Sequence, residues 1–164
     1  MTPKKTTEVE EFLRESNAIE RVYDDKSLEN AKYAWGYLMD HDTITIHIVK
    51  RVHSILMYNH LPHPDLGTFR NIMVYIGGKP AINPLRILER MNQWCAAMVS
   101  TNPTHNSKDL HVMYEGIHPF VDGNGRTGRM FMNWHRLKIT GEQLLIIHQG
   151  EEQRKYYEWF RKDN

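Results

Sequence analysis

The stretch from 118 to 129 reads HPFVDGNGRTGR and holds the residue types best suited to phosphate chemistry. Its centre consists of residues that tolerate positive φ, namely Gly123, Asn124 and Gly125. Successive backbone N–H groups there can form a concave nest for an anion, and that nest would open a helix whose positive end attracts anions further. Arg126 and Arg129 lie three apart on this helix, so both guanidiniums can reach one face. The stretch therefore predicts a polyphosphate site.

Asp122 and His118 flank the nest and could act on a bound phosphate. A carboxylate beside a polyphosphate is the usual minimal protein ligand for Mg²⁺, so Asp122 predicts a magnesium site. His118 ends the preceding helix and can face the same cavity. The nearby arginines and the metal should disfavour its protonated form, which leaves a neutral imidazole as a general base at pH 7. Phe120 is expected to turn inward and anchor the loop.

Each of these features also has a simpler explanation. A lone histidine is usually structural, Gly-Asn-Gly is usually a turn, and two helical arginines are usually solvated. All three explanations would have to hold together in consecutive residues, which favours the functional interpretation. The segment also satisfies the dinucleotide pattern G-x-G-x-x-G, but that pattern needs a preceding strand, and the residues before His118 have helical spacing.

Apolar residues spaced three and four apart predict helices over most of the chain. The predicted helices lie at about 8–24, 28–38, 44–57, from Pro84 to a break at 102–104, from 110 to His118, 123–140 and around 156–160. In the helix that follows Pro84, the residues expected to face inward are Leu85, Ile87, Leu88, Met91 and Trp94.

Residues 67–83 differ, because they are rich in β-forming residues around a Gly77-Gly78 turn. A lone hairpin is only marginally stable and has to lie on the helical body. We therefore expect an all-α, mainly helical fold with one short β-hairpin, in a single domain that covers residues 1–164.

Composition narrows the function classes. A chain of 164 residues is long enough for one core, and a formal net charge of +1 gives no global field for nucleic acid or a membrane surface. Cys95 is the only cysteine, so an internal disulfide and a Cys-rich zinc site are excluded, and its apolar neighbours predict a buried, inert thiol. No secretory signal and no bilayer-length apolar stretch are evident, which favours a cytoplasmic location. No H-E-x-x-H pattern exists, and structural or solvated roles are expected for the histidines at 60, 63, 105, 111, 135 and 148.

The segment 118–129 resembles the Fic (Fido) family motif, H-P-F-x-D/E-G-N-G-R-x-x-R, at every specified position. The resemblance extends over most of the chain, since Gly67-Thr68-Phe69-Arg70 with the hairpin resembles the family's flap, and Arg154-Lys155-Tyr156-Tyr157 resembles its adenosine-side helix. It implies an α-helical Fic fold and a protein adenylyltransferase. Such an enzyme moves AMP from ATP to a Ser, Thr or Tyr hydroxyl of a target protein and releases pyrophosphate.

The resemblance also implies a role for each motif residue. His118 deprotonates the target hydroxyl, Asp122 holds Mg²⁺ against the α- and β-phosphates, and Arg129 holds the γ-phosphate. The remaining phosphate contacts come from Gly123, Asn124, Gly125 and Arg126. Tyr156 and Asn164 correspond to positions that contact adenosine. The flap residues that bind an extended segment of the target are Met73, Val74, Tyr75, Ile76, Gly77, Gly78 and Lys79.

An inhibitory motif of the family, S/T-x-x-x-E-G/N, resembles the stretch from Ser16 to Glu20 within the predicted helix at about 8–24. In members that carry it, the glutamate pairs with the second motif arginine, here Arg129, and obstructs the γ-phosphate position. A carboxylate can compete with phosphate for one guanidinium, which makes the expectation physically sound. Arg21 departs from the pattern, because the family has Gly or Asn there.

Other activities stay open within this interpretation. Relatives transfer UMP, phosphocholine or phosphate, and the phosphate-transferring variant has Lys where this chain keeps Gly125, which favours AMP. Removal of AMP from a modified target is a further alternative, because Glu20 could position a water. A non-catalytic nucleotide-binding regulatory module would need neither His118 nor Asp122. The target and the oligomeric state, a homodimer included, are not encoded in any motif.

Overall fold

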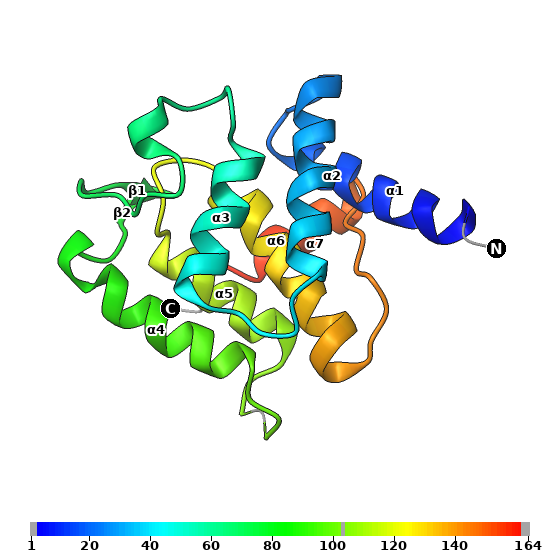
Figure 1. The fold of residues 1–164 in the computed structure, drawn as a ribbon. Helices are drawn as coiled ribbons and strands as arrows, with labels where there is room; N and C mark the ends of the chain where they lie inside the picture. The colour runs from blue at the N-terminus through cyan, green and yellow to red at the C-terminus, as the bar shows by residue number, and fades with distance from the viewer. Residues whose placement is uncertain (1–2, 103, 162–164) are drawn as a thin grey trace.

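Helix α6 (Asn124–His135) is the central element of the computed structural model, which describes residues 3–102 and 104–161 (Figure 1). All of its residues are buried except the half-buried Gly125, and it contacts α1, α2, α3 and α5. The other α-helices are α1 (Pro3–Ile19), α2 (Asp25–Met39), α3 (Ile46–Leu56), α4 (Ile87–Met98), α5 (Ser107–Ile117) and α7 (Glu151–Glu158). A short π-helix, Arg136–Thr140, extends α6 until Gly141 ends it in the left-handed conformation. The expected single, mainly helical domain is confirmed.

Several helices begin at capping side chains that satisfy their free N–H groups. Asp24 accepts from the Ser27 amide at the start of α2 (2.9 Å), and Thr45 accepts from the Ile48 amide at the start of α3 (3.2 Å). A reciprocal capping box fixes the start of α5.

The apolar stripe predicted in α2 is buried as expected, at Leu28, Ala31, Ala34 and Leu38. Cys95 in α4 is buried as well, and burial raises the pKa of its thiol to about 12, so the thiol is inert at neutral pH.

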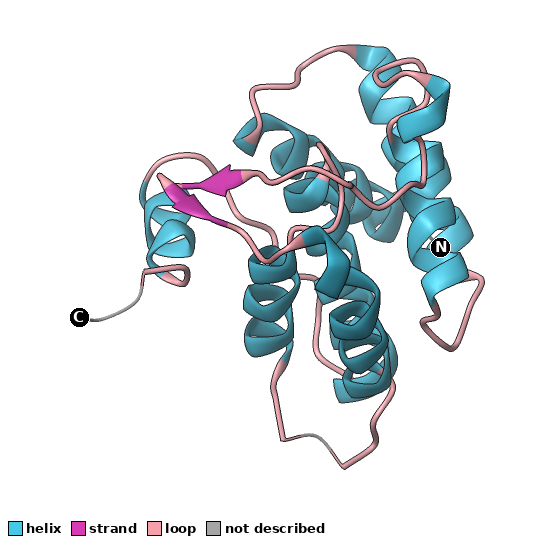
Figure 2. Ribbon diagram, turned by 90° about the vertical axis from the view of Figure 1, so that its left-hand side faces the viewer, coloured by secondary structure: helices cyan, strands magenta, loops and turns pink. Residues whose placement is uncertain are grey.

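The hairpin is shorter than the range 67–83 predicted. Its strands are β1 (Tyr75–Ile76) and β2 (Lys79–Pro80), which pair antiparallel with Tyr75 opposite Pro80 (Figure 2). Gly77 and Gly78 form the expected turn, both with positive φ, as a two-residue type I′ connection requires. The rest of the β-forming stretch is irregular because its backbone is held by Arg70 rather than by a neighbouring strand.

Two other predictions about elements are corrected. Leu85 and Leu88 do not face inward: they are 91% and 56% exposed, because residues Pro84–Arg86 form a 3₁₀ turn that shifts the register before α4 begins. The helix predicted at about 8–24 ends at Ile19, so Glu20 lies in the turn between α1 and α2.

In the described ranges, no helix combines the length and the apolar character needed to cross a membrane.

Candidate functional site

His118 lies at the junction between α5 and the loop that leads to α6. It ends α5 as a C-cap in the left-handed conformation (φ 51°, ψ 63°), and its N–H donates to the Tyr114 carbonyl at 2.9 Å. A non-glycine residue in this region is strained by roughly 1–2 kcal/mol, so the surroundings must hold it there. Arg70 does so, since its Nε donates to the His118 carbonyl at 2.6 Å.

Arg70 is the residue that joins the flap to this loop. Its guanidinium is buried and donates to the backbone carbonyls of Ile72, Ile82, Ile117 and His118. Its own N–H donates to the Pro119 carbonyl at 2.9 Å. No local sequence pattern reveals this role of Arg70 beyond its resemblance to the flap, because its partners lie up to 48 positions away.

The electrostatic surroundings of His118 favour its neutral form. Burial lowers the pKa of the half-buried imidazole, and the charge of Arg70 lowers it further, while the Glu115 carbonyl and Asp122 oppose the shift. The direction agrees with the expectation from sequence, but the main cause is burial rather than the motif arginines. Nδ1 is buried, which leaves Nε2 as the nitrogen available to a substrate.

A second histidine, His53 on α3, positions Asp122. Its Nδ1 accepts from the Gly67 N–H at 3.0 Å, so Nε2 carries the proton and donates to the Asp122 carbonyl at 2.9 Å. The ring stacks on Phe120 with centroids 3.7 Å apart, and burial lowers its pKa to about 4, so it stays neutral. The Asp122 side chain is exposed and accepts from the Gly123 N–H at 2.8 Å through Oδ1, and Oδ2 has no partner among the described residues.

The predicted nest takes the form of a helix N-terminus. Gly123 alone has positive φ (87°), whereas Asn124 and Gly125 are already helical, which corrects the expectation of a nest over all three. Among the described residues no side chain caps this end of α6, so its first amides are free for an anion. Asn124 points the other way, because its side-chain amide bonds both the N–H and the carbonyl of the buried Phe120. Asn124 therefore shapes the loop instead of presenting its side chain to a phosphate.

The two motif arginines have different surroundings. Arg126 is buried, donates from Nη2 to Met57 Sδ at 3.3 Å, and has no partner for its buried Nε in the described part of the chain. Burial lowers its pKa, as expected for a guanidinium whose charge is incompletely paired. Arg129 is buried and almost fully bonded. Nε donates to Ser16 Oγ (2.8 Å), Nη1 to the Tyr156 hydroxyl (3.1 Å), and Nη2 to both the Ser16 carbonyl (3.0 Å) and Glu20 Oε1 (2.8 Å).

Gly125 makes the contact between Glu20 and Arg129 sterically feasible. A Cβ at this position would collide with Glu20 Oε1 and would lie 3.0 Å from Arg129 Nη1. Gly125 therefore leaves the space that the Glu20–Arg129 ion pair occupies, and it is also part of the N-terminus of α6. The predicted site residues His118, Asp122, Gly123, Gly125, Arg126 and Arg129 all lie along the α5–α6 junction and the first turns of α6, and Ser16 and Glu20 reach them from α1 and the turn that follows it.

A model of the Fic/DOC family matches residues 43–135, more than half of the chain. The chain belongs to the Fic/DOC family. It is 32% identical over 138 residues to a Drosophila erecta protein named protein adenylyltransferase Fic, and 31% identical over 138 residues to the Drosophila melanogaster protein of that name. Each of these matches covers 81% of this chain but 27% of the relative, so the chain spans about a quarter of the length of the curated relatives.

Solved structures of the family share the fold. A Fic domain containing signaling protein from Bacteroides thetaiotaomicron superimposes with a TM-score of 0.75 at 15% identity, over 94% of this chain and 70% of that one. Residues 134–508 of Fic-1 from C. elegans give a TM-score of 0.75 at 22% identity, over 95% of this chain and 55% of that one.

Arg21 follows Glu20 at the position where the inhibitory motif that residues 16–20 resemble has Gly or Asn. Arg21 is left-handed (φ 57°), and its N–H donates to the Ala18 carbonyl as the chain leaves α1. Glycine and asparagine adopt this conformation more readily than other residues, which accounts for their place in the motif.

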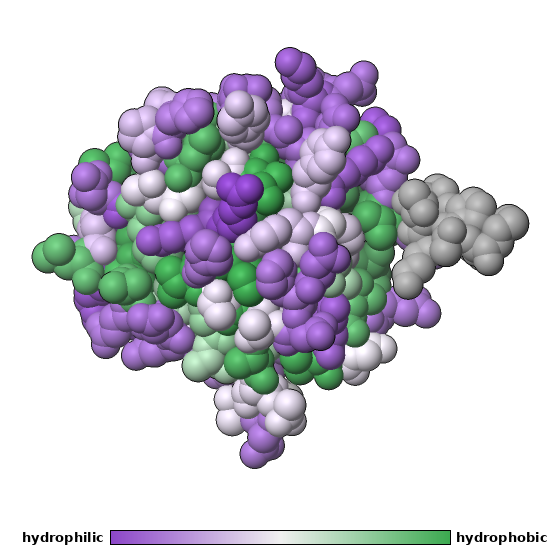
Figure 3. Space-filling model, in the orientation of Figure 1, coloured by the Kyte–Doolittle hydropathy of each residue, from purple (hydrophilic) through white to green (hydrophobic). Residues whose placement is uncertain are grey.

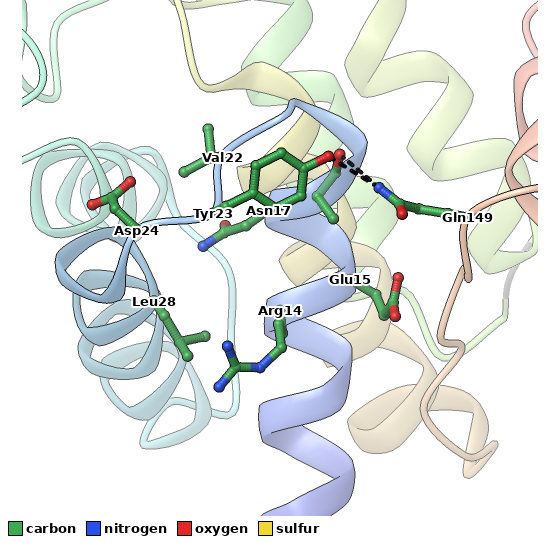
Figure 4. A pocket seen from close by; sticks show the side chains of 9 residues that line it. Arg14, Glu15, Asn17, Val22, Tyr23, Asp24, Leu28 and Gln149 are labelled. Carbon is green, nitrogen blue, oxygen red and sulfur yellow. Dashed lines mark hydrogen bonds between the residues drawn. The ribbon is translucent and has the colours of Figure 1, made fainter.

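A cavity of about 220 Å³ borders the same turn between α1 and α2. Tyr23 and Gln149 are among the residues that line it, and Gln149 Nε2 lies 3.2 Å from the Tyr23 hydroxyl (Figure 4). The turn is therefore open on that side.

The two predicted adenosine contacts have different outcomes. Tyr156 is buried against Ile19 and Ile147, and its hydroxyl bonds both His111 (2.7 Å) and Arg129. It holds Arg129 in place and does not face open solvent. Tyr157 is 47% exposed and is the tyrosine of α7 that remains accessible to a ligand. Asn164 lies outside the described residues.

The Asp122 site fits magnesium of the kind that ATP carries. Among the described residues no group of three or more His, Cys, Asp or Glu side chains gathers to hold a metal. One carboxylate oxygen without a partner among the described residues, beside a helix end that no side chain caps, suits an ion that keeps several waters and bridges phosphate oxygens. It does not suit zinc, which requires several protein ligands.

Proposed function

We propose that this chain is a protein adenylyltransferase that transfers AMP from ATP to a Ser, Thr or Tyr hydroxyl of a target protein, held in check by Glu20 on Arg129. The observation that carries the proposal is the junction itself. His118, which is neutral and strained, and the exposed carboxylate of Asp122 lie beside the start of α6, where no described side chain caps the helix. Arg129 of that helix is bonded to Glu20. The curated relatives that match most of this chain are named protein adenylyltransferase, which supports the same activity.

In this proposal the triphosphate lies along the N-terminus of α6. The free amides of α6 and the guanidinium of Arg126 bind its phosphates, and Arg129 binds the γ-phosphate once Glu20 moves away. Asp122 would hold Mg²⁺, which supplies charge neutralisation to the phosphates when it is bound.

His118 acts on the target. Its Nε2 accepts the proton of the target hydroxyl while that oxygen attacks the α-phosphorus, and the bond between the α-phosphorus and the bridging oxygen breaks. AMP is then esterified to the target, and pyrophosphate leaves. The exposed edge of the hairpin around Tyr75 and Ile76 would pair with an extended segment of the target and bring the hydroxyl in line.

Labelled nucleotides test this function. Wild type, Glu20→Gly and His118→Ala are incubated with Mg²⁺, cytoplasmic lysate and ATP labelled at either the α- or the γ-phosphate. Transfer of the α label alone by Glu20→Gly, and its loss in His118→Ala by about 10²- to 10⁴-fold, is the expected result. Transfer of the γ label would indicate phosphotransfer, and labelling only from UTP would indicate UMP transfer. Release of AMP from a modified target by wild type but not by Glu20→Gly would indicate removal instead. Nucleotide binding without any transfer would identify a regulatory module.

The strain at Arg21 gives a further prediction. Arg21→Gly relieves a left-handed non-glycine residue, which should stabilise the turn that carries Glu20 by roughly 1 kcal/mol. We expect Tm to rise by about 2–4 °C and AMP transfer to fall about five-fold, because Glu20 then occupies Arg129 more of the time. The matched control is Asn59→Gly, which changes another left-handed residue in a different turn and should leave the transfer rate unchanged. A faster reaction in Arg21→Gly would contradict the proposal that this turn holds Glu20 on Arg129.

A further inference from the structure

Exposed aliphatic side chains gather beside the hairpin. In the described ranges, six large aliphatic residues are exposed, and all but Leu137 lie between 72 and 88. We call these five the flap patch: Ile72, Met73, Ile76, Leu85 and Leu88. Hydrophobic side chains face solvent at the edge of the molecule where the hairpin and the start of α4 lie (Figure 3). A clustered apolar surface of this kind usually marks an interaction site, whereas single exposed apolar residues do not.

Two residues of the flap patch, Met73 and Leu85, line a cavity of about 310 Å³ between the segment 70–73, which leads into the hairpin, and the 3₁₀ turn before α4. Its lining consists of Arg70, Asn71, Met73, Asn83, Pro84 and Leu85. This volume is at the low end for small-molecule sites, and it suits one or two side chains of a polypeptide.

The lining carries no charge that is free to bind a ligand. Arg70 is its only charged residue, and that guanidinium is committed to four backbone carbonyls. Asn83 uses its side-chain oxygen to accept from the Leu85 N–H at 3.0 Å, so its amide N–H₂ is what it offers outward. Apolar walls with amide donors favour an apolar side chain on a peptide backbone over an anion or a cation.

The cavity is held at a fixed distance from His118. The same guanidinium that lines it reaches the carbonyls of Ile117 and His118, at 3.1 and 2.6 Å. A polypeptide segment on the hairpin edge would therefore pass the cavity and the imidazole together.

We propose that this cavity is a specificity pocket that binds a large apolar side chain of the target, such as Leu, Ile or Met, close in sequence to the modified hydroxyl. The inference rests on the proposed function and adds a sequence preference to it. One arginine side chain spans the interval and a strand advances about 3.3 Å per residue, so the apolar residue lies within about three positions of the hydroxyl. Leu85 lines the cavity and would contact the apolar side chain of the target, which explains why a leucine is 91% exposed at this point.

A positional peptide library tests the pocket. Extended peptides with one central Ser, Thr or Tyr and every residue type at three positions on each side are labelled by the Glu20→Gly protein with α-labelled ATP. We expect peptides with Leu, Ile or Met at one particular position to be labelled with a kcat/KM about 10- to 100-fold above those with Asp or Gly there. Leu85→Asp should abolish that preference and favour Lys or Arg at the same position. Leu137→Asp, which changes an exposed leucine elsewhere, should keep the apolar preference.

The outcomes separate this inference from the proposed function. Equal labelling of all peptides, or labelling of lysate proteins without any peptide preference, overturns the pocket while AMP transfer stands. An apolar preference that survives Leu85→Asp also overturns it. If neither peptides nor lysate proteins are labelled although ATP binds, the proposed function fails and this inference fails with it.

Discussion

Glu20→Gly is expected to transfer AMP at least about 10-fold faster than wild type. A guanidinium has five N–H donors, and Arg129 uses four of them on Ser16, Tyr156 and Glu20. Without Glu20, two donors of this buried, charged group have no partner among the described residues. A hydrogen bond to a charged group contributes about 1.5–3 kcal/mol, which corresponds to roughly 10- to 100-fold in γ-phosphate binding.

Stability provides an independent measurement of the same contact. The Glu20→Gly protein without nucleotide should have a lower Tm than wild type, because a buried guanidinium loses its acidic partner. ATP with Mg²⁺ should then raise its Tm more than it raises that of wild type, since the phosphate replaces the lost partner.

Paired glutamine variants control for charge and helix effects. Glu20→Gln removes the charge but keeps the shape, and should lie between wild type and Glu20→Gly in rate. Glu15→Gln makes the same chemical change one turn earlier, at a residue of α1 that does not contact Arg129, and should leave the rate at the wild-type value. Equal rates for wild type and both Glu20 variants would show that Glu20 does not restrain this enzyme.

The sequence predicted the candidate site best where the site residues are contiguous in the chain. The motif from His118 to Arg129 is continuous in sequence, so the loop and the first turns of α6 bring its members close together. The partners that position them come from elsewhere: His53 and Arg70 lie 69 and 48 positions from the backbone atoms they bind. No periodicity could have identified them, because a hydrogen bond to a carbonyl depends on tertiary placement and not on the residue type that supplies the carbonyl.

Helical periodicity gave a wrong prediction of burial at the start of α4. It identifies residues that share a face, as in α2, where the predicted stripe is buried. It does not say whether that face meets the core or a ligand. Leu85 and Leu88 were predicted as core and are exposed beside the flap, and the mismatch between apolar character and exposure is what points to the specificity pocket. The fold adds to Tyr156 a role that periodicity did not indicate, because its buried hydroxyl bonds Arg129.

Arg70→Met is expected to lower the kcat of AMP transfer by about 100-fold with little change in the affinity for ATP. Arg70 contacts none of the residues at the start of α6 that bind phosphate in this proposal, but it holds the carbonyls of Ile117 and His118 and so fixes the strained backbone that aims the imidazole. A shift of about 1 Å in a catalytic group is enough for a loss of this size. Arg70→Lys keeps the charge but cannot reach four carbonyls with one ammonium, so it should restore only part of the rate.

A structural role alone would give a different pattern. Loss of Arg70 leaves buried carbonyls without a donor, each at about 1–3 kcal/mol, so the variants will unfold at lower temperature and must be assayed well below their Tm. At that temperature, general unfolding would reduce ATP binding and kcat together, whereas misaligned His118 reduces kcat and leaves ATP binding in place. Arg86→Met, which removes an exposed arginine from the 3₁₀ turn near the same cavity, is the matched control and should retain the wild-type kcat. A kcat in Arg70→Met equal to that of Arg86→Met would mean that the flap and His118 are positioned independently, and that the arginine between them serves the fold alone.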